Sequence, residues 1–420
     1  MKRMFCVICI LAILICGLHT LALGEESGAQ SQYALSVGAA VRVITPTIEK
    51  GMLPALRRSE EGYFEVVDVV DDIHVRVIAL SDGTTNSLMI CTESGGAPQP
   101  AYFLPILSEH TGIDIDAIFY TATHSHACPE IGGEPDATDE YGQRLLIWRE
   151  YILEQMLDAC DEAIAEMQPA TVGVGHGSSY ININRSATYV GYNEDGSSYT
   201  YKDLGYNGSG SSDKELIVVR FDAMDGNPIA FVVNYAVHGV VMHMNKLIDG
   251  EMGLSADIPG LVSSYMEKNY EGSVAMWISG AAGDQNPIIM NEMYRVNPET
   301  GEKVLYHIPG GSYDILEYLS EIQYRDVVDT LANIDTMNAD VKISYERNTI
   351  DLPGQEATRI DKYTYEYADS DEPYTMALQM LRIGDIAFVG YPGELFSSIG
   401  EYMKRSALVP TKMPLVRVRL

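Results

Sequence analysis

One pattern recurs three times along this chain: an apolar strand, a tight turn that contains glycine, a second apolar strand, and a polar residue at its exit. The three stretches are HVRVIALSDGTTNSLMICTE, ELIVVRFDAMDGNPIAFVVNYAVH and MALQMLRIGDIAFVGYPGE, which end at Glu93, His238 and Glu394. Each predicts a β-hairpin. Polar residues at strand exits can cluster on one edge of a sheet, where sites are commonly built. The chain is therefore expected to bring distant polar residues together.

Further strands and helices surround these hairpins. Helical patterns follow over 141–167, from about residue 257, over 313–334 and over 395–406. The segment 181–212 is rich in Gly, Ser, Tyr and Asn and is predicted to be a long surface loop. We expect an α/β fold of mixed β-sheets flanked by helices, formed as one domain by residues 33–420.

The first 24 residues have the features of a secretory signal peptide. A basic start, MKRM, precedes the apolar stretch FCVICILAILICGL, and Ala22 and Gly24 supply small residues for cleavage. No other long apolar run follows, so no stable membrane span is expected. The predicted location is secreted, meaning extracellular or periplasmic.

The charge is strongly acidic, with 59 Asp and Glu against 28 Lys and Arg. Such a surface repels nucleic-acid phosphates, so a nucleic-acid partner is not expected. Beyond the signal the chain keeps Cys91, Cys128 and Cys160, an odd number that does not suggest a disulfide framework. Cys128 lies close to two histidines, as a metal ligand or nucleophile would. The favoured interpretation is a buried structural thiol.

Two histidines follow an apolar strand in TATHSHACP. Residues two apart in a strand point to the same side, so His124 and His126 are directed together. The pair can supply two metal ligands, or one ligand and one acid–base group. Taken singly, each is more often a hydrogen-bonded structural residue.

His238 and Glu394 extend this set. Two histidines and a carboxylate commonly hold a catalytic zinc ion, which lowers the pKa of water to about 7. His243 is a weaker ligand candidate because it falls in an expected loop. Without a metal, Glu394 would be a helix-start carboxylate favoured by the helix dipole.

Three further residues complete the candidate site. Arg185 offers a planar fork for a carbonyl oxygen or hydroxyl of the substrate. Asp257 and Asp284 are candidates for orienting the ligand histidines from behind. Each aspartate is otherwise a cap or turn residue.

Seven stretches, in order, resemble motifs of the neutral, non-lysosomal ceramidase family: VGAAVRVITP, TATHSHACPE, ININRS, YAVHG, LSADIPG, GAAGDQNP and YPGEL. The resemblance implies a ceramidase-like catalytic domain, a zinc-dependent amidase that cleaves an N-acyl bond. It implies His124, His238 and Glu394 as zinc ligands, and His126 and Arg185 as contacts of the substrate and its developing oxyanion.

The chain also departs from that family. Asn286 replaces the serine of the family's SPN triplet, and LSADIPG stands where a GDNKG stretch is typical. The family's downstream tyrosine ligand and β-sandwich domain are not found before Leu420, so the C-terminal part is expected to be truncated. The resemblance is therefore to the wider ceramidase-like group.

The leading hypothesis is a secreted zinc hydrolase of an amide bond, with a small-molecule or lipid amide as substrate. His126 and Arg185 would stabilise charge on the carbonyl oxygen. Two alternatives stay open. One is a related hydrolase of a soluble acyl ester or amide, and the other is an inactive secreted binding protein.

Overall fold

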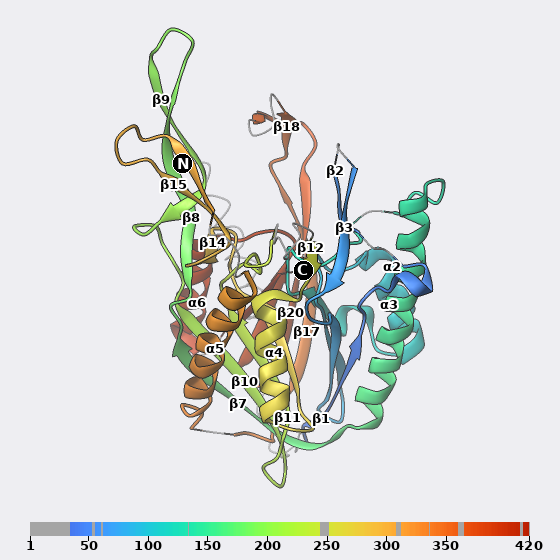
Figure 1. Ribbon diagram of the computed structural model, residues 1–420. Helices are drawn as coiled ribbons and strands as arrows, with labels where there is room; N and C mark the ends of the chain where they lie inside the picture. Colours follow the sequence, from blue (N-terminus) through green and yellow to red (C-terminus); the bar gives the residue numbers. More distant parts are fainter. Residues whose placement is uncertain are drawn as a thin grey trace.

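The computed structural model describes residues 34–52, 55–59, 62–132, 134–243, 252–307, 312–335, 337–359, 365–411 and 415–419 (Figure 1). The predicted signal peptide lies outside these residues.

An eight-stranded mixed sheet forms the centre of the molecule (Figure 1). Its strands, in spatial order, are β13 (Val274–Ser279), β11 (Pro228–Tyr235), β10 (Glu215–Ala223), β7 (Gln168–Ser178), β1 (Ser36–Val43), β4 (His74–Ser81), β5 (Asn86–Thr92) and β6 (Ile118–Ala122). Most neighbours are antiparallel, but β11 pairs with β13 and β5 with β6 in parallel. Two of the three predicted hairpins, β4–β5 and β10–β11, lie in this sheet.

A second sheet and most of the helices cover the central sheet, and the last helix packs on the second sheet. The second sheet contains β17 (Ile343–Leu352), β20 (Tyr374–Ile383), β21 (Ile386–Tyr391) and β22 (Leu415–Arg419), with the third predicted hairpin as β20–β21. The helices are α2 (Pro100–Thr111), α3 (Glu140–Ala165), α4 (Asp257–Asn269), α5 (Ser312–Leu331) and α6 (Ser397–Thr411). The prediction of mixed sheets flanked by helices is confirmed.

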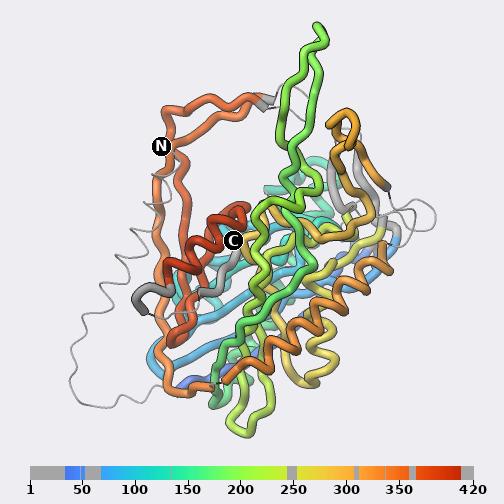
Figure 2. The backbone as a smooth tube through the Cα atoms, turned by 90° about the vertical axis from the view of Figure 1, so that its left-hand side faces the viewer, coloured from blue at the N-terminus to red at the C-terminus, as the bar shows by residue number. Residues whose placement is uncertain are grey.

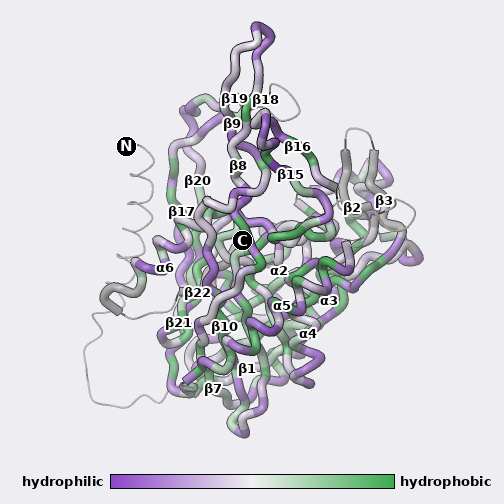
Figure 3. Tube along the Cα trace, turned by 60° about the vertical axis from the view of Figure 1, so that its left-hand side comes forward, coloured by the Kyte–Doolittle hydropathy of each residue, from purple (hydrophilic) through white to green (hydrophobic). Residues whose placement is uncertain are grey.

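Successive side chains of a central strand point to opposite faces of the sheet, so each face packs against a different layer. In β4, Val75 and Val77 pack toward α3, whereas Ile78 and Leu80 pack toward the second sheet. A strand that is buried on both faces is apolar along most of its length, as β4 is apart from Arg76. Each fully buried aliphatic side chain stabilises the fold by roughly 1.5–3 kcal/mol. Hydrophobic residues accordingly follow the central strands, and hydrophilic residues mark the hairpin tips (Figure 3).

Smaller sheets stand above one end of the central sheet (Figures 1 and 2). They are formed by β8 (Asn182–Tyr192), β9 (Ser198–Asn207) and β14 (Gln285–Pro287); by β15 (Glu292–Val296) and β16 (Lys303–His307); by β2 (Ala55–Ser59), β3 (Gly62–Val69) and β12 (Met252–Leu254); and by β18 (Gln355–Arg359) and β19 (Tyr365–Asp369). Two short 3-10 helices, η1 (Ile48–Lys50) and η2 (Ile115–Ala117), complete the elements.

The loop predicted over 181–212 is wrong for most of its length, because β8 and β9 form a long protruding hairpin there (Figure 2). Tyr189 pairs with Tyr201 across the hairpin, and the two rings lie 5.7 Å apart. A Cβ on Gly205 would lie 1.8 Å from the Tyr189 hydroxyl, so glycine lets that buried ring cross the partner strand. Tyr and Thr favour strands although they carry polar groups, so the polar composition of this segment led to the wrong prediction of a loop.

No helix within the described residues is long and apolar enough to cross a membrane.

Candidate metal centre and active site

The two edges of the central sheet approach each other at the site. β6 and β13 are the outermost strands, yet the Ser279 hydroxyl donates a hydrogen bond to the Thr123 carbonyl over 2.7 Å. The Cys91 thiol likewise contacts the Trp277 carbonyl at 3.2 Å. The sheet therefore curls, and the segments that leave its two edges meet.

The segment after β6 is fixed by its backbone. His124 has φ 61, in the left-handed region that few residues other than glycine adopt, and its Nδ1–H donates to the Gly95 carbonyl. Ser125 forms a parallel bridge with Gly239, and the His126 amide donates to the Gly239 carbonyl over 2.8 Å. This bridge places both histidines beside the segment after β11. Unusual backbone of this kind is found preferentially at functional sites.

His238 follows β11 and its side chain is fully buried. Its Nδ1–H donates to the Gln285 carbonyl over 3.1 Å. His124 and His238 therefore both donate from Nδ1 to a backbone carbonyl, and both direct Nε2 toward a common centre. Metal-binding histidines typically use the second ring nitrogen in this way, because that hydrogen bond fixes the tautomer and the ring orientation.

Glu394 closes the cluster from the turn between β21 and α6. Its Oε1 lies 3.6 Å from Nε2 of His124, and its Oε2 lies 3.3 Å from Nε2 of His238. A Cβ on Gly283 would lie 2.4 Å from the Glu394 carbonyl oxygen, so only glycine permits this close approach. The turn is thereby held against the loop that follows β13.

His126 joins the same centre. Its Nε2 lies 3.0 Å from Nε2 of His124, and His124, His126 and His238 each offer one ring nitrogen such that the three nitrogens lie within 4.8 Å of one another. Two ligands of a tetrahedral zinc ion, each about 2.0–2.1 Å from it, stand roughly 3.3 Å apart. The separations of 3.0, 3.3 and 3.6 Å therefore fit a metal site formed by three imidazoles and a carboxylate.

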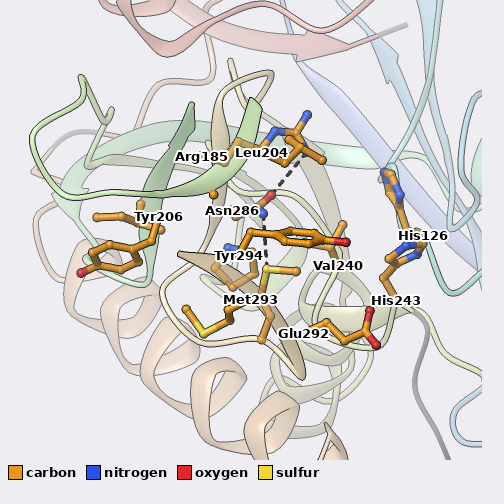
Figure 4. A pocket seen from close by; sticks show the side chains of 14 residues that line it. His126, Arg185, Leu204, Tyr206, Val240, His243, Asn286, Glu292, Met293 and Tyr294 are labelled. Atoms are coloured by element: carbon orange, nitrogen blue, oxygen red, sulfur yellow. Dashed lines mark hydrogen bonds between the residues drawn. The ribbon is translucent and has the colours of Figure 1, made fainter. Parts of the chain in front are cut away.

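Arg185 lies on β8, beside Glu394. Its guanidinium donates to the Gly283 carbonyl (3.1 Å), to Oδ1 of Asn286 (3.3 Å) and to Oε2 of Glu394 (2.7 Å). The planar group is held on three sides while one part of it faces a cavity (Figure 4). Arg185 thus binds the predicted ligand carboxylate as well as facing the space where a substrate would lie.

The cavity has a volume of about 330 Å³, and His126, Arg185 and His243 line it (Figure 4). Burial, followed by the neighbouring His124, His238, His243 and Arg185, lowers the pKa of His126 far below its ordinary value. Its imidazole is therefore neutral at pH 7. A neutral ring can bind a metal or accept a proton.

The two predicted supporting aspartates take different positions. The Asp284 carboxylate accepts hydrogen bonds from the Ser397 amide (2.7 Å), Nδ2 of Asn184 (2.9 Å) and Nε2 of Gln285 (2.9 Å). It ties together the elements that carry Glu394, Arg185 and the carbonyl that holds His238. Asp284 therefore supports the ligands by fixing the segments that carry them, rather than by bonding to a histidine ring.

Asp257 is fully buried and holds a turn instead. Its carboxylate accepts from the Met242 amide (2.7 Å) and the Ile258 amide (2.8 Å), and its φ is 59. The turn that it holds carries His243, whose ring lies 5.5 Å from that of His126. Burial raises the pKa of Asp257 to about 6, against the lowering effect of those amides.

Two other residues that attracted notice in the sequence have structural roles. Cys128 is buried and its thiol donates to the Ser255 carbonyl over 3.1 Å, and burial raises the thiol pKa well above its ordinary value. It is the buried structural thiol that was favoured. Glu93 is also buried, where it pairs with Arg76 and with Nδ1 of His74 at 2.9 Å. Its carboxylate serves that ion-pair network, while Gly95, two residues on, supplies the carbonyl for His124.

No protein-family model and no curated protein sequence matches the chain. Two solved structures resemble it strongly. The crystal structure of neutral ceramidase from Pseudomonas aeruginosa has a TM-score of 0.67 and 15% identity, over 92% of this chain and 67% of that one. A ceramidase complexed with C2 has a TM-score of 0.67 and 16% identity, over 92% and 68%. Over most of its length, therefore, the chain has the fold of the neutral ceramidases, which is the fold that its motifs predict.

Proposed function

We propose that this chain is a secreted, zinc-dependent hydrolase of an amide bond, of the ceramidase type. The observation that carries the proposal is the convergence of His124, His126, His238 and Glu394 at ligand spacing. Two of the rings are already oriented by backbone carbonyls. The likeness to ceramidase structures supports an N-acyl bond as the target.

The donor set suits zinc, because imidazole nitrogens and a carboxylate oxygen are its usual ligands. A bound zinc ion lowers the pKa of water to about 7 and polarises a carbonyl group. His124, His238 and Glu394 are the proposed ligands, and His126 stands beside them as the proposed substrate contact.

The chain's own residues act around that centre. Arg185 presents a fixed positive charge to the cavity, where negative charge develops on the substrate's carbonyl oxygen. His126 is neutral and lines the same cavity, so it can hydrogen-bond the substrate and hold a proton for the leaving amine. The contacts of Arg185 with Gly283 and Asn286 hold its planar group in one orientation before the substrate binds.

The direct test is elemental analysis with activity assays on purified wild type, His124→Ala and His238→Ala. His176→Ala is the matched control, since His176 is a half-exposed histidine whose ring pairs with Glu215. We expect about one zinc per chain in wild type and control, and loss of both zinc and amide hydrolysis in the two site variants. Unchanged zinc content in both site variants would refute the ligand assignment.

The same assay separates the alternatives. Release of fatty acid from ceramide is compared with release from short soluble acyl amides and esters. Stoichiometric zinc without turnover on any of them would favour a binding protein. Secretion is tested separately, by following the full chain into the medium or periplasm and comparing it with a chain that lacks residues 1–24.

A further inference from the structure

The short pairing between β14 and β8 directs an amide side chain to the cavity beside Arg185. Asn286 of β14 lies directly opposite Ile183 of β8, so their side chains point to the same face of the pairing. Arg185, two residues further along β8, points to that face as well. All three residues line the cavity beside the metal centre (Figure 4). This face therefore presents a guanidinium and an amide side by side.

The opposite face of the same pairing anchors it to the rest of the fold. Gln285 and Asn184 lie opposite each other there and are buried. Nδ2 of Asn184 donates to the Asp284 carboxylate over 2.9 Å, and Nε2 of Gln285 donates to the Ser211 carbonyl over 3.0 Å. These amides serve the fold, whereas Asn286 is directed to the cavity.

Arg185 determines which end of the Asn286 amide faces it. A guanidinium has only donors, so the atom that it contacts at 3.3 Å is the amide oxygen Oδ1 (Figure 4). The amide nitrogen Nδ2 therefore faces away from Arg185. It lies 3.3 Å from Sδ of Met290, which also lines the cavity. A thioether is a weak acceptor, so an oxygen atom of a ligand would be a better partner for this donor.

The two ends of the guanidinium order the site. Nη2 of Arg185 bonds to the Glu394 carboxylate, whereas Nη1 bonds to Asn286. The Asn286 donor thus lies on the side of Arg185 that faces away from the proposed metal ligands. A substrate whose carbonyl group lies between those ligands and Arg185 would bring an atom a few bonds further along to Nδ2.

We propose that Asn286 is a specificity-determining residue, whose Nδ2 donates a hydrogen bond to an oxygen atom that the substrate carries a few bonds from its scissile carbonyl. The preferred substrates are amides with a hydroxyl, ether or carbonyl oxygen near the amide, because an alkyl group at that place would leave the donor without a good acceptor. This inference rests on the proposed amide hydrolysis and names its substrate class. The oxygen can belong to the acyl side or to the amine side.

The test uses two isosteric pairs of amides, in which an ether oxygen replaces one methylene group. On the acyl side, the ethylamides of methoxyacetic acid and butanoic acid are compared. On the amine side, the pair is N-acetyl methoxyethylamine and N-acetyl butylamine. An ether accepts a hydrogen bond and cannot donate one, so it probes the donor at Nδ2. The pair that responds identifies the side of the bond that carries the oxygen.

Two variants separate recognition from intrinsic reactivity. Asn286→Leu keeps the side chain's size and removes the donor. Asn286→Asp keeps an acceptor for Arg185 and replaces the donor with a second acceptor. In one pair, the ratio of kcat/KM for the ether to that for the alkyl amide should be about 5–10-fold higher in wild type than in either variant. Dividing by the ratio in the variant cancels the difference in reactivity between the two amides.

Asn269→Leu is the matched control. Asn269 is an exposed asparagine of α4 whose Nδ2 donates to the Tyr265 carbonyl, and its replacement should keep the wild-type ratio. If Asn286 only oriented Arg185, its loss would lower kcat/KM for both members of a pair equally. Ratios that are equal in wild type and both Asn286 variants, for both pairs, would therefore overturn the inference.

Calorimetric titration with the same amides keeps the test independent of turnover. If nothing is hydrolysed, yet wild type binds one ether more tightly than its alkyl partner and Asn286→Leu does not, the inference stands and the proposed function fails. If the amides are hydrolysed with equal ratios, the function stands and the inference fails. If nothing is hydrolysed and the affinities are equal, both fail. Zinc content and circular dichroism confirm that each variant is folded.

Discussion

Arg185 donates a hydrogen bond to Oε2 of Glu394 over 2.7 Å, although 209 positions separate the two residues in the chain. The arginine thus neutralises part of the charge of a proposed zinc ligand while it faces the cavity. A guanidinium can make this contact and the two bonds to Gly283 and Asn286 together, whereas an ammonium group cannot.

Arg185→Lys should therefore lower kcat/KM for amide hydrolysis by about 10²–10³-fold, because the charge remains but its fixed orientation is lost. Zinc content should stay near that of wild type. Steady-state kinetics and elemental analysis measure both, with the exposed Arg325→Lys as the control. Wild-type kinetics in Arg185→Lys would show that the planar guanidinium group has no catalytic role.

Gly283→Ala tests the close approach between two loops. The added Cβ would meet the Glu394 carbonyl oxygen at 2.4 Å and push the glutamate turn away, so we expect a drop in zinc affinity of about 10–100-fold. Gly226→Ala, at φ +88 with open space around it, is the control and should only lower the free energy of unfolding by about 1–2 kcal/mol. Equal zinc affinities in both variants would contradict the expectation.

Asp257 makes stability depend on pH. Its folded pKa of about 6 lies above the unfolded value of 3.8, so the folded state holds the extra proton between these values. Its contribution to stability is full below pH 3.8 and is lost as the pH rises through about 6. Asp257→Asn removes this titration, and asparagine tolerates the φ of 59.

Denaturant unfolding at pH 4, 5, 6 and 7 measures this effect. The free energy of unfolding of wild type should fall relative to that of Asp257→Asn, by up to about 1.4 kcal/mol per pH unit within the window. Parallel curves for the two proteins would mean that Asp257 is ionised throughout.

Cys128 should be chemically inert in the folded protein. Its thiol is buried and its pKa is raised, so little thiolate forms. Iodoacetamide at pH 8 should leave activity intact, and Cys128→Ala should keep kcat/KM within about twofold while losing about 1 kcal/mol of stability with the bond to Ser255. Inactivation by alkylation at Cys128, together with an inactive Cys128→Ala, would instead make the thiol part of the site.

Local patterns predicted much of the fold, because apolar alternation and glycine turns act over short distances. The hairpins β4–β5, β10–β11 and β20–β21 and the helix α3 were all evident from the sequence. The hairpin β8–β9 was missed because its buried positions, all on β8, are filled by asparagine, alanine and tyrosine rather than by an apolar run. The helix α2 was not predicted, and its sequence contains Pro105, an unusual residue inside a helix.

The candidate site was predicted less completely. The HSH pair, His238 and Glu394 stood out as polar residues at strand exits, and their chemistry suggested one zinc site, which the family resemblance also implied. Their meeting depends on the curl of the central sheet, which arises from summed strand twist and has no local sequence signal. The support that Asp284 gives through Ser397 and Asn184 could not be read from the sequence either, because it joins residues 100 or more positions apart.

The contact between the outermost strands has a consequence for assembly. His124 leaves one margin of the sheet and His238 the strand next to the other, so neither half of the chain contains a complete donor set. A partly folded chain would bind a divalent ion weakly. The ion would stabilise only the state in which the two edge strands are in contact. Loading with metal would thus report that the contact between the two edge strands has formed.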